Sequence, residues 1–172
     1  MNLSLKSKKS LVLALFVKVA QAANFTEISG VSQDVKGIRF PTFCTSKHKV
    51  PNLIHTVEPS STDTISVWTD PPNLVTTTIQ HELLQLWWNR TVSDSAQGGG
   101  VRIRFPPSKL ATIEACCSAS VQILPGFSNL EDLTASTSSN VRAVFEASDT
   151  TPRISVLDVS TSAKVFCGRC HY

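Results

Sequence analysis

Three segments in the C-terminal half of the chain share one pattern of apolar and polar positions. They begin at Ile113, Leu133 and Leu157, which are 20 and 24 residues apart, and they align without a gap. Each copy is apolar at alternate positions, changes to small polar residues, and continues with Val at the same position. Alternation of this kind predicts strands with one buried face. Repetition at such a period is typical of stacked coils in a β-solenoid.

The alternation assigns one face of each copy to the interior. Small residues alternate with branched ones on this face, as a narrow interior requires. The predicted interior residues are Ile113, Ala115, Cys117, Val121 and Ile123, then Leu133, Ala135, Thr137, Val141 and Ala143, then Leu157, Val159, Thr161, Val165 and Cys167. Tight bends are expected at 118–120, 138–140 and 162–164, where small polar residues favour turns.

The chain before the repeats also favours strands. β-Branched and aromatic residues predict strands at 65–68, 75–79, 82–88 and 101–105, with a Gly-rich loop between the last two. Residues 23–60 are weakly patterned and contain scattered Gly and Pro, so a loop-rich segment is expected there.

The stretch from Ile65 to Cys167 resembles the autotransporter-adhesin head domain family, also called the GIN domain. The matching features are strands 65–68, 83–88 and 101–105 followed by Pro106, then Leu110 and Ile113, and then small-residue corners followed by Val-x-apolar. The family usually has Gly-Ser-Gly at the corners, whereas this chain has Ser-Ala-Ser, Ser-Ser-Asn and Ser-Ala-Lys. The resemblance implies a right-handed β-helix that is exported and surface-associated, with no established catalytic residues.

The N-terminus has the three parts of a secretory signal peptide. Lys6, Lys8 and Lys9 precede a short apolar run at 11–17, and Ala20-Gln21-Ala22 is a small-x-small cleavage sequence. We therefore expect three regions: a signal peptide (1–22), a loop-rich segment (23–60) and an all-β, GIN-like solenoid domain (61–172). The mature protein is expected to begin at Ala23 and to be secreted or held at the cell surface. The apolar run is too short for a stable membrane span.

Removal of the signal changes the charge of the chain. The full sequence has 16 Lys and Arg, 13 Asp and Glu and a net charge of +3. Residues 1–22 hold four lysines and no acid, so the remainder carries 12 bases and 13 acids, a net charge of −1. No basic stripe remains to indicate a nucleic-acid partner.

The last cysteines form the sequence Cys167-Gly168-Arg169-Cys170-His171, which matches the CxxCH motif for c-type haem. A disulfide between Cys167 and Cys170, or a pair of thiols, is the preferred interpretation. The only methionine is Met1, and Cys167 is already accounted for as the end of the third copy. No cofactor is therefore expected, and haem stays an alternative.

A metal site and a catalytic pair are weaker alternatives. Zinc bound by the terminal cysteines would need a further ligand from Cys44, His48 or His55, which nothing in the sequence brings close. Glu114 and Asp158 occupy equivalent outward positions two strands apart, about 9–10 Å, near the separation used by inverting glycosidases. Outward carboxylates normally keep a sheet soluble, so neither a metal nor an enzyme is expected.

Two kinds of residue bear on sugars. The sequons at Asn24 and Asn89 are candidate glycosylation sites in a eukaryotic source. Trp87 and Trp88 are adjacent, so on a strand they face opposite ways, one toward the core and one as a glycan platform or an end cap.

Taken together, the sequence predicts an exported, non-catalytic β-solenoid with a surface or adhesive role and an unidentified cell-surface or glycan ligand. The main alternative is a structural module that self-associates through the end of the solenoid.

Overall fold

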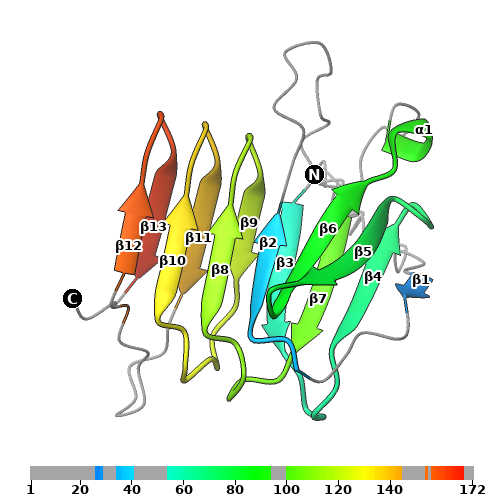
Figure 1. The fold of residues 1–172 in the computed structure, drawn as a ribbon, viewed down its shortest axis with the longest axis horizontal. Coiled ribbons are helices and arrows are strands. Elements are labelled where there is room, and N and C mark those ends of the chain that lie inside the picture. Colours follow the sequence, from blue (N-terminus) through cyan, green and yellow to red (C-terminus); the bar gives the residue numbers. More distant parts are fainter. Residues whose placement is uncertain are drawn as a thin grey trace, which may run out of the picture.

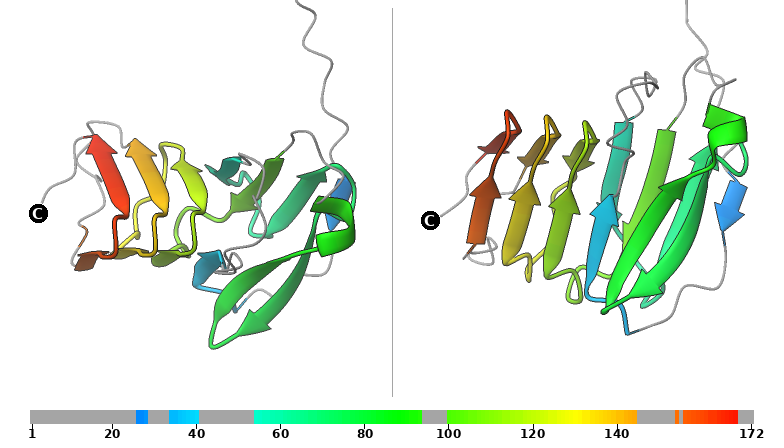
Figure 2. Two further views of the ribbon diagram at one scale, coloured as in Figure 1. Left: turned by 90° about the horizontal axis from the view of Figure 1, so that it is seen from above. Right: turned by 45° about the horizontal axis from the view of Figure 1, so that its top comes forward.

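The computed structural model describes residues 26–28, 34–40, 54–93, 100–144, 154 and 156–168. Within these residues lie thirteen strands and one short helix, α1 (Arg90–Ser93), so the chain is nearly all β, as predicted. The strands form two mixed sheets (Figure 1). Figure 2 shows the sheets as two facing layers where they are built from β8 to β13.

The larger sheet has seven strands. Their order across the sheet is β1 (Thr26–Ile28), β4 (Ser66–Asp70), β7 (Gly100–Phe105), β3 (Ile54–Pro59), β9 (Ser120–Ile123), β11 (Asn140–Val144) and β13 (Lys164–Gly168). The pairs from β7 to β13 are parallel. At the other end β4 is antiparallel to β7, and β1 is antiparallel to β4.

The smaller sheet has six strands. Their order is β12 (Val156–Val159), β10 (Asp132–Ala135), β8 (Thr112–Ala115), β2 (Gly37–Phe40), β6 (Leu83–Trp88) and β5 (Val75–Gln80). All pairs are parallel except the hairpin of β5 and β6. No helix in the described ranges is long and apolar enough to cross a bilayer.

The register of the three copies is confirmed. Leu133 pairs with Ile113 on one side and with Leu157 on the other. Val141 lies in the same way between Val121 and Val165. Each copy therefore contributes one strand to each sheet, and equivalent residues of neighbouring copies are adjacent.

The interior face is confirmed for the first copy and for most of the second. The predicted residues of the first copy are buried, as are Leu133, Ala135, Val141 and Ala143. Thr137 is exposed, whereas the equivalent Cys117 of the first copy is buried, and Ser139 is buried like its equivalent Ala119. The third copy is more open. Leu157 and Val159 are 37% and 44% exposed, since β12 is the outermost strand of its sheet and has a neighbour on one side only. The side chain of Cys167 lies outside the described residues.

The bends begin one residue earlier than predicted. Cys117 and Ser118 have φ angles of 55° and 68°, and the equivalent pairs in the other copies, Thr137 with Ser138 and Thr161 with Ser162, are also left-handed. Neighbouring bends are bonded to each other. The Ser118 amide donates to Thr137 O at 2.9 Å, and the Ser138 amide donates to Thr161 O at 2.9 Å. Stacked turns thus continue the hydrogen bonding of the sheets.

The expectation of a loop-rich segment over 23–60 is wrong for β2 and β3. In the smaller sheet β2 lies between β6 and β8, and in the larger sheet β3 lies between β7 and β9. These strands come earlier in the sequence than all four of their neighbours. Short length hid β2, but burial of Ile38 and Phe40 shows that it is part of the core. The space beside Gly37 is filled, since a Cβ there would lie 2.6 Å from Leu83 Cδ2.

The four strands predicted between 65 and 105 are confirmed as β4, β5, β6 and β7. The turn between β5 and β6 consists of His81 and Glu82, both left-handed, as expected for a two-residue hairpin. Glu82 bonds Lys36 Nζ at 2.9 Å.

Candidate functional site

The outward surface of the larger sheet carries one continuous row of side chains. Strand pairing places Trp68 opposite Arg102, Arg102 opposite Thr56, and Thr56 opposite Gln122. Gln122 is in turn opposite Arg142, and Arg142 is opposite Phe166. We call these six residues the outer row. It crosses six strands, with an arginine beside each of its two aromatic residues and two neutral polar residues in the middle. Backbone pairing continues beyond Trp68 to Glu27 of β1.

Arginine side chains lie over both aromatic rings of the outer row. The Cζ of Arg104 is 4.7 Å from the centroid of Trp68, and the Cζ of Arg142 is 5.7 Å from the centroid of Phe166. Both distances are within the range of cation–π attraction. These contacts orient guanidinium groups along the surface of the sheet.

One carboxylate is shared by two arginines of the same strand. Glu58 Oε1 is 2.6 Å from Arg104 Nε, and its Oε2 is 3.8 Å from Arg102 Nε. The Glu58 side chain is mostly buried by these neighbours, whereas those of Arg102 and Arg104 are 42% and 48% exposed. Glu58 therefore balances part of the positive charge of Arg102 and Arg104.

The outward faces of the two sheets differ in charge. Among the described side chains, the larger sheet presents four cations and two carboxylates: Arg102, Arg104, Arg142, Lys164, Glu58 and Asp70. The smaller sheet presents one cation and three carboxylates: Arg39, Glu114, Asp132 and Asp158. An anionic ligand is therefore attracted to the larger sheet and repelled by the smaller one.

The predicted carboxylate pair lies on the smaller sheet. Glu114 is opposite Thr134, and Thr134 is opposite Asp158, so the predicted register of the two acids is confirmed. Arg39 Nε lies 3.1 Å from Glu114 Oε2 and occupies one side of that carboxylate. This ion pair gives Glu114 a structural role on the wet surface of the sheet.

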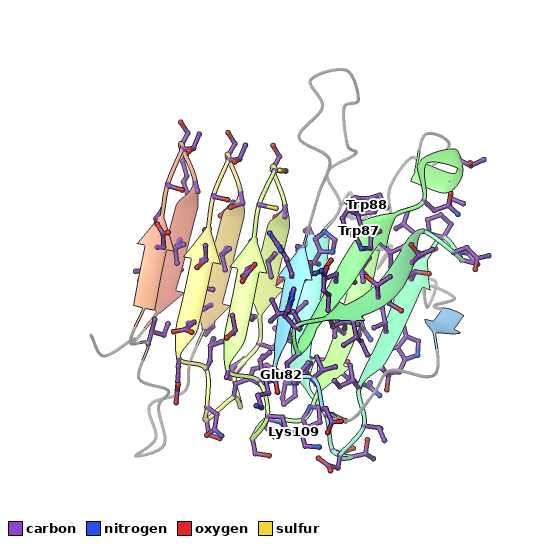
Figure 3. The ribbon with its side chains drawn as sticks, in the orientation of Figure 1. Glu82, Trp87, Trp88 and Lys109 are labelled. Carbon is purple, nitrogen blue, oxygen red and sulfur yellow. The ribbon has the colours of Figure 1, made fainter. Side chains whose placement is uncertain are left out.

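The two adjacent tryptophans face opposite sides of β6, as predicted (Figure 3). Trp88 is buried in the core, and Trp87 is 40% exposed on the outward face. The indole N–H of Trp87 donates to Thr78 Oγ1 at 3.0 Å. Trp87 thus lies on the face of the sheet, and its ring is held against the edge strand β5.

His55, a residue weighed as a zinc ligand, lies in the core. Its ring centroid is 4.7 Å from that of Phe40 and 5.3 Å from that of Trp88. Its Nδ1 is buried and has no hydrogen-bond partner among the described residues. Burial lowers its pKa to about 4, because the charged form would lose its hydration. Within the described residues, no three His, Cys, Asp or Glu side chains are grouped to hold a metal ion.

Several predicted positions lie outside the described residues. These are Asn24, Cys44, His48, Cys170, His171 and the side chain of Cys167. The glycan, disulfide and haem assignments at these positions stay predictions. Asn89 is half-buried just before α1, and its backbone N–H donates to Leu74 O at 2.9 Å. Its glycosylation also stays a prediction.

The sequence alone did not reveal the outer row. Alternation in 101–105 already placed Arg102 and Arg104 on one face of a strand. Their neighbours Trp68 and Thr56 come from distant parts of the chain, and the order of the strands decides that they meet. That order was hidden because β2 and β3 were not recognised.

Comparison with known proteins identifies no family. No family model matches the chain, and no curated protein matches it. Two solved structures, each described as a "putative adhesin", align with part of this chain. The one from Bacteroides fragilis has a TM-score of 0.39 and 9% identity, and covers 79% of this chain and 59% of its own. The one from Parabacteroides merdae has a TM-score of 0.39 and 15% identity, and covers 70% of this chain and 56% of its own. This chain therefore spans less than two thirds of either protein.

Proposed function

We propose that the protein is an exported, non-catalytic, right-handed β-solenoid that acts in surface attachment. The observation that carries the proposal is the parallel register of the copies, which aligns equivalent side chains into rows across wide outward faces. Stacked repeats characteristically provide extended binding surfaces of this kind. The signal-like N-terminus supports export. The resemblance to the GIN domain family is consistent with export and with surface attachment.

Adhesion of coated beads tests this proposal. Beads carrying the secreted protein should attach to cells or extracellular matrix more strongly than beads carrying the same protein after thermal unfolding. The folded surface is needed because the rows exist only when distant strands pair. Equal attachment of both bead types would contradict the proposal. N-terminal sequencing of the secreted material should give Ala23, and an intact Met1 confined to the cytoplasm would contradict export.

A second candidate function is self-assembly through the outermost strands. β12 and β13 are the last strands of the two sheets in the described part of the chain, and each has one free edge in the strand order. Phe166 is 59% exposed on β13, and Leu157 and Val159 are partly exposed on β12. Exposed edges and apolar residues favour pairing with another chain.

Light scattering separates this candidate from the first. Self-assembly predicts a mass that rises with concentration and falls when Val159→Lys places a charge at the open end. A constant monomer mass over the whole concentration range would contradict it. Absorption spectroscopy tests the remaining haem alternative, which requires a Soret band that Cys170→Ser and His171→Ala abolish.

A further inference from the structure

We propose that the outer row binds a linear polysaccharide that carries carboxylate groups, such as a polyuronate. This inference rests on the proposed attachment function and names the class of its ligand. Three described properties of the outer row agree with such a ligand: the sign of the charge around it, the spacing of its arginines, and its aromatic residues.

The charge favours an acidic polymer on this face alone. Among the described side chains, cations outnumber carboxylates on the outward face of the larger sheet, and carboxylates outnumber cations on that of the smaller sheet. A polyanion approaching the protein is therefore oriented toward the outer row by the field of both sheets. This orientation weakens as salt is added, because exposed charges are screened.

The arginines match carboxylates in chemistry and in spacing. A guanidinium group has a planar set of donors that can bind a carboxylate through two hydrogen bonds. Arg102 and Arg142 lie on β7 and β11, which are separated by β3 and β9. Three strand spacings put them about 14 Å apart. They can therefore contact carboxylates on different sugars of one chain.

The neutral and aromatic residues fit the uncharged parts of a sugar polymer. Thr56 and Gln122 lie between the two arginines and can both donate and accept hydrogen bonds with hydroxyl groups. Trp68 and Phe166 add aromatic rings to the row, each with an arginine over the ring, so apolar and cationic groups are combined at these two positions. The row crosses the strands from β4 to β13, so an extended polymer can follow it. A peptide adding to a strand edge would instead run along the strands.

Titration with a decagalacturonate tests the inference, with calorimetry on the full secreted protein at low salt. We expect saturable binding that weakens as salt is raised. Dextran, which is uncharged, should not bind. Polyglutamate, which has carboxylates but no sugar rings, should bind at least tenfold more weakly. Equal affinity for polyglutamate, or no affinity for the galacturonate, would overturn the inference.

Matched substitutions locate the binding surface. Arg142→Gln should weaken galacturonate binding about tenfold, as expected for loss of a charge-assisted pair. Arg39→Gln removes the same charge from the opposite sheet and should change affinity less than twofold. Both residues are exposed, so both variants should retain the melting temperature of the wild type within a few degrees. Equal losses in the two variants would overturn the assignment to the outer row.

The binding experiment and the bead experiment can fail independently, so failure of the ligand assignment is distinguishable from failure of the attachment function. If beads attach to cells while galacturonate does not bind, the ligand class is wrong and attachment stands. If galacturonate binds the outer row while beads fail to attach to any surface, the ligand class stands and the attachment function is wrong.

Discussion

His55 is an ionisable residue buried in the core. Its neighbours on both adjoining strands, Val101 and Val121, are valines, so an imidazole occupies a position otherwise apolar. Phe40 and Trp88 cover its ring, and no ion pair of the described residues involves it. The neutral form is compatible with this surrounding, whereas the protonated form is not.

Acid should destabilise the protein through His55. The pKa of His55 is about 4 in the folded protein, against 6.5 for an ordinary histidine. As the pH falls, the unfolded chain therefore binds a proton at His55 before the folded protein does. The contribution of neutral His55 to the free energy of unfolding is complete above pH 6.5 and is lost as the pH falls toward 4. The loss is at most about 3 kcal/mol. Urea unfolding of wild type and His55→Leu across this range measures it.

Subtracting the pH dependence of unfolding of His55→Leu from that of wild type leaves the contribution of His55, because the carboxylates are present in both proteins. His81→Asn removes an exposed imidazole from a left-handed turn position that Asn tolerates, and it serves as the control. A wild-type pH dependence identical to that of His55→Leu would show that His55 does not remain neutral in the core.

The turn residues provide a second prediction at this scale. Ser138 has a φ of 62°, a conformation that costs a non-glycine residue about 1 kcal/mol. Ser138→Gly should therefore stabilise the protein by roughly 0.5 kcal/mol after the greater flexibility of unfolded glycine is subtracted. Ser136→Gly, two residues earlier and outside the left-handed pair, should be destabilising. Thermal melting that ranks the two variants in the opposite order would contradict the turn conformation.

At the scale of the element, the sequence predicts the strands of the three copies and their register well. Alternation gave the correct strands and the correct register because buried and exposed positions differ in polarity at every step. It failed at Thr137 and Thr161, which lie in turns and are exposed, and at Leu157 and Val159, which lie on the outermost strand of the smaller sheet. Neither the start of a turn nor the end of a stack is encoded by alternation itself.

A matched pair of lysines tests the register. Leu133→Lys would bury an unpaired charge at a position with no exposure and should cost about 3–5 kcal/mol of unfolding free energy. Thr134→Lys, on the outward face between Glu114 and Asp158, should be tolerated and gains two acidic neighbours. Chemical unfolding gives both values. Similar losses in the two variants would show that the strand does not present Leu133 to the core.

The strands that the sequence did not predict have a common physical reason. β2 has four residues and β3 contains a core histidine and a terminal proline, so neither has a strong strand pattern. Their stability comes from neighbours on both sides, which belong to distant parts of the chain. Tertiary pairing overrides weak local propensity in such cases.

At the scale of the whole molecule, the described side chains give the outward faces of the two sheets opposite charge. The placement of β2 and β3 in the middle of the sheets is what makes these faces continuous. On the larger sheet, Thr56 of β3 links the arginine of β7 to the residues of the repeats. The outer row, and with it the proposed ligand, depends on this strand order.

Disulfide trapping tests the strand order most directly. Arg39 and Glu114 are opposite each other on β2 and β8, and both side chains point outward. Replacing both with cysteine should give a cross-link on mild oxidation, because adjacent strands are about 4.8 Å apart and disulfides span similar Cα distances. The pair Arg39→Cys and Thr134→Cys, one strand further apart at about 10 Å, should not cross-link.

Peptide mapping by mass spectrometry identifies the linked residues and separates them from the native cysteines. The account predicts a peptide joining positions 39 and 114 in the first variant, and none joining 39 and 134 in the second. Absence of the 39–114 link in folded protein, or equal yields of both links, would contradict the placement of β2 beside β8 on which the architecture rests.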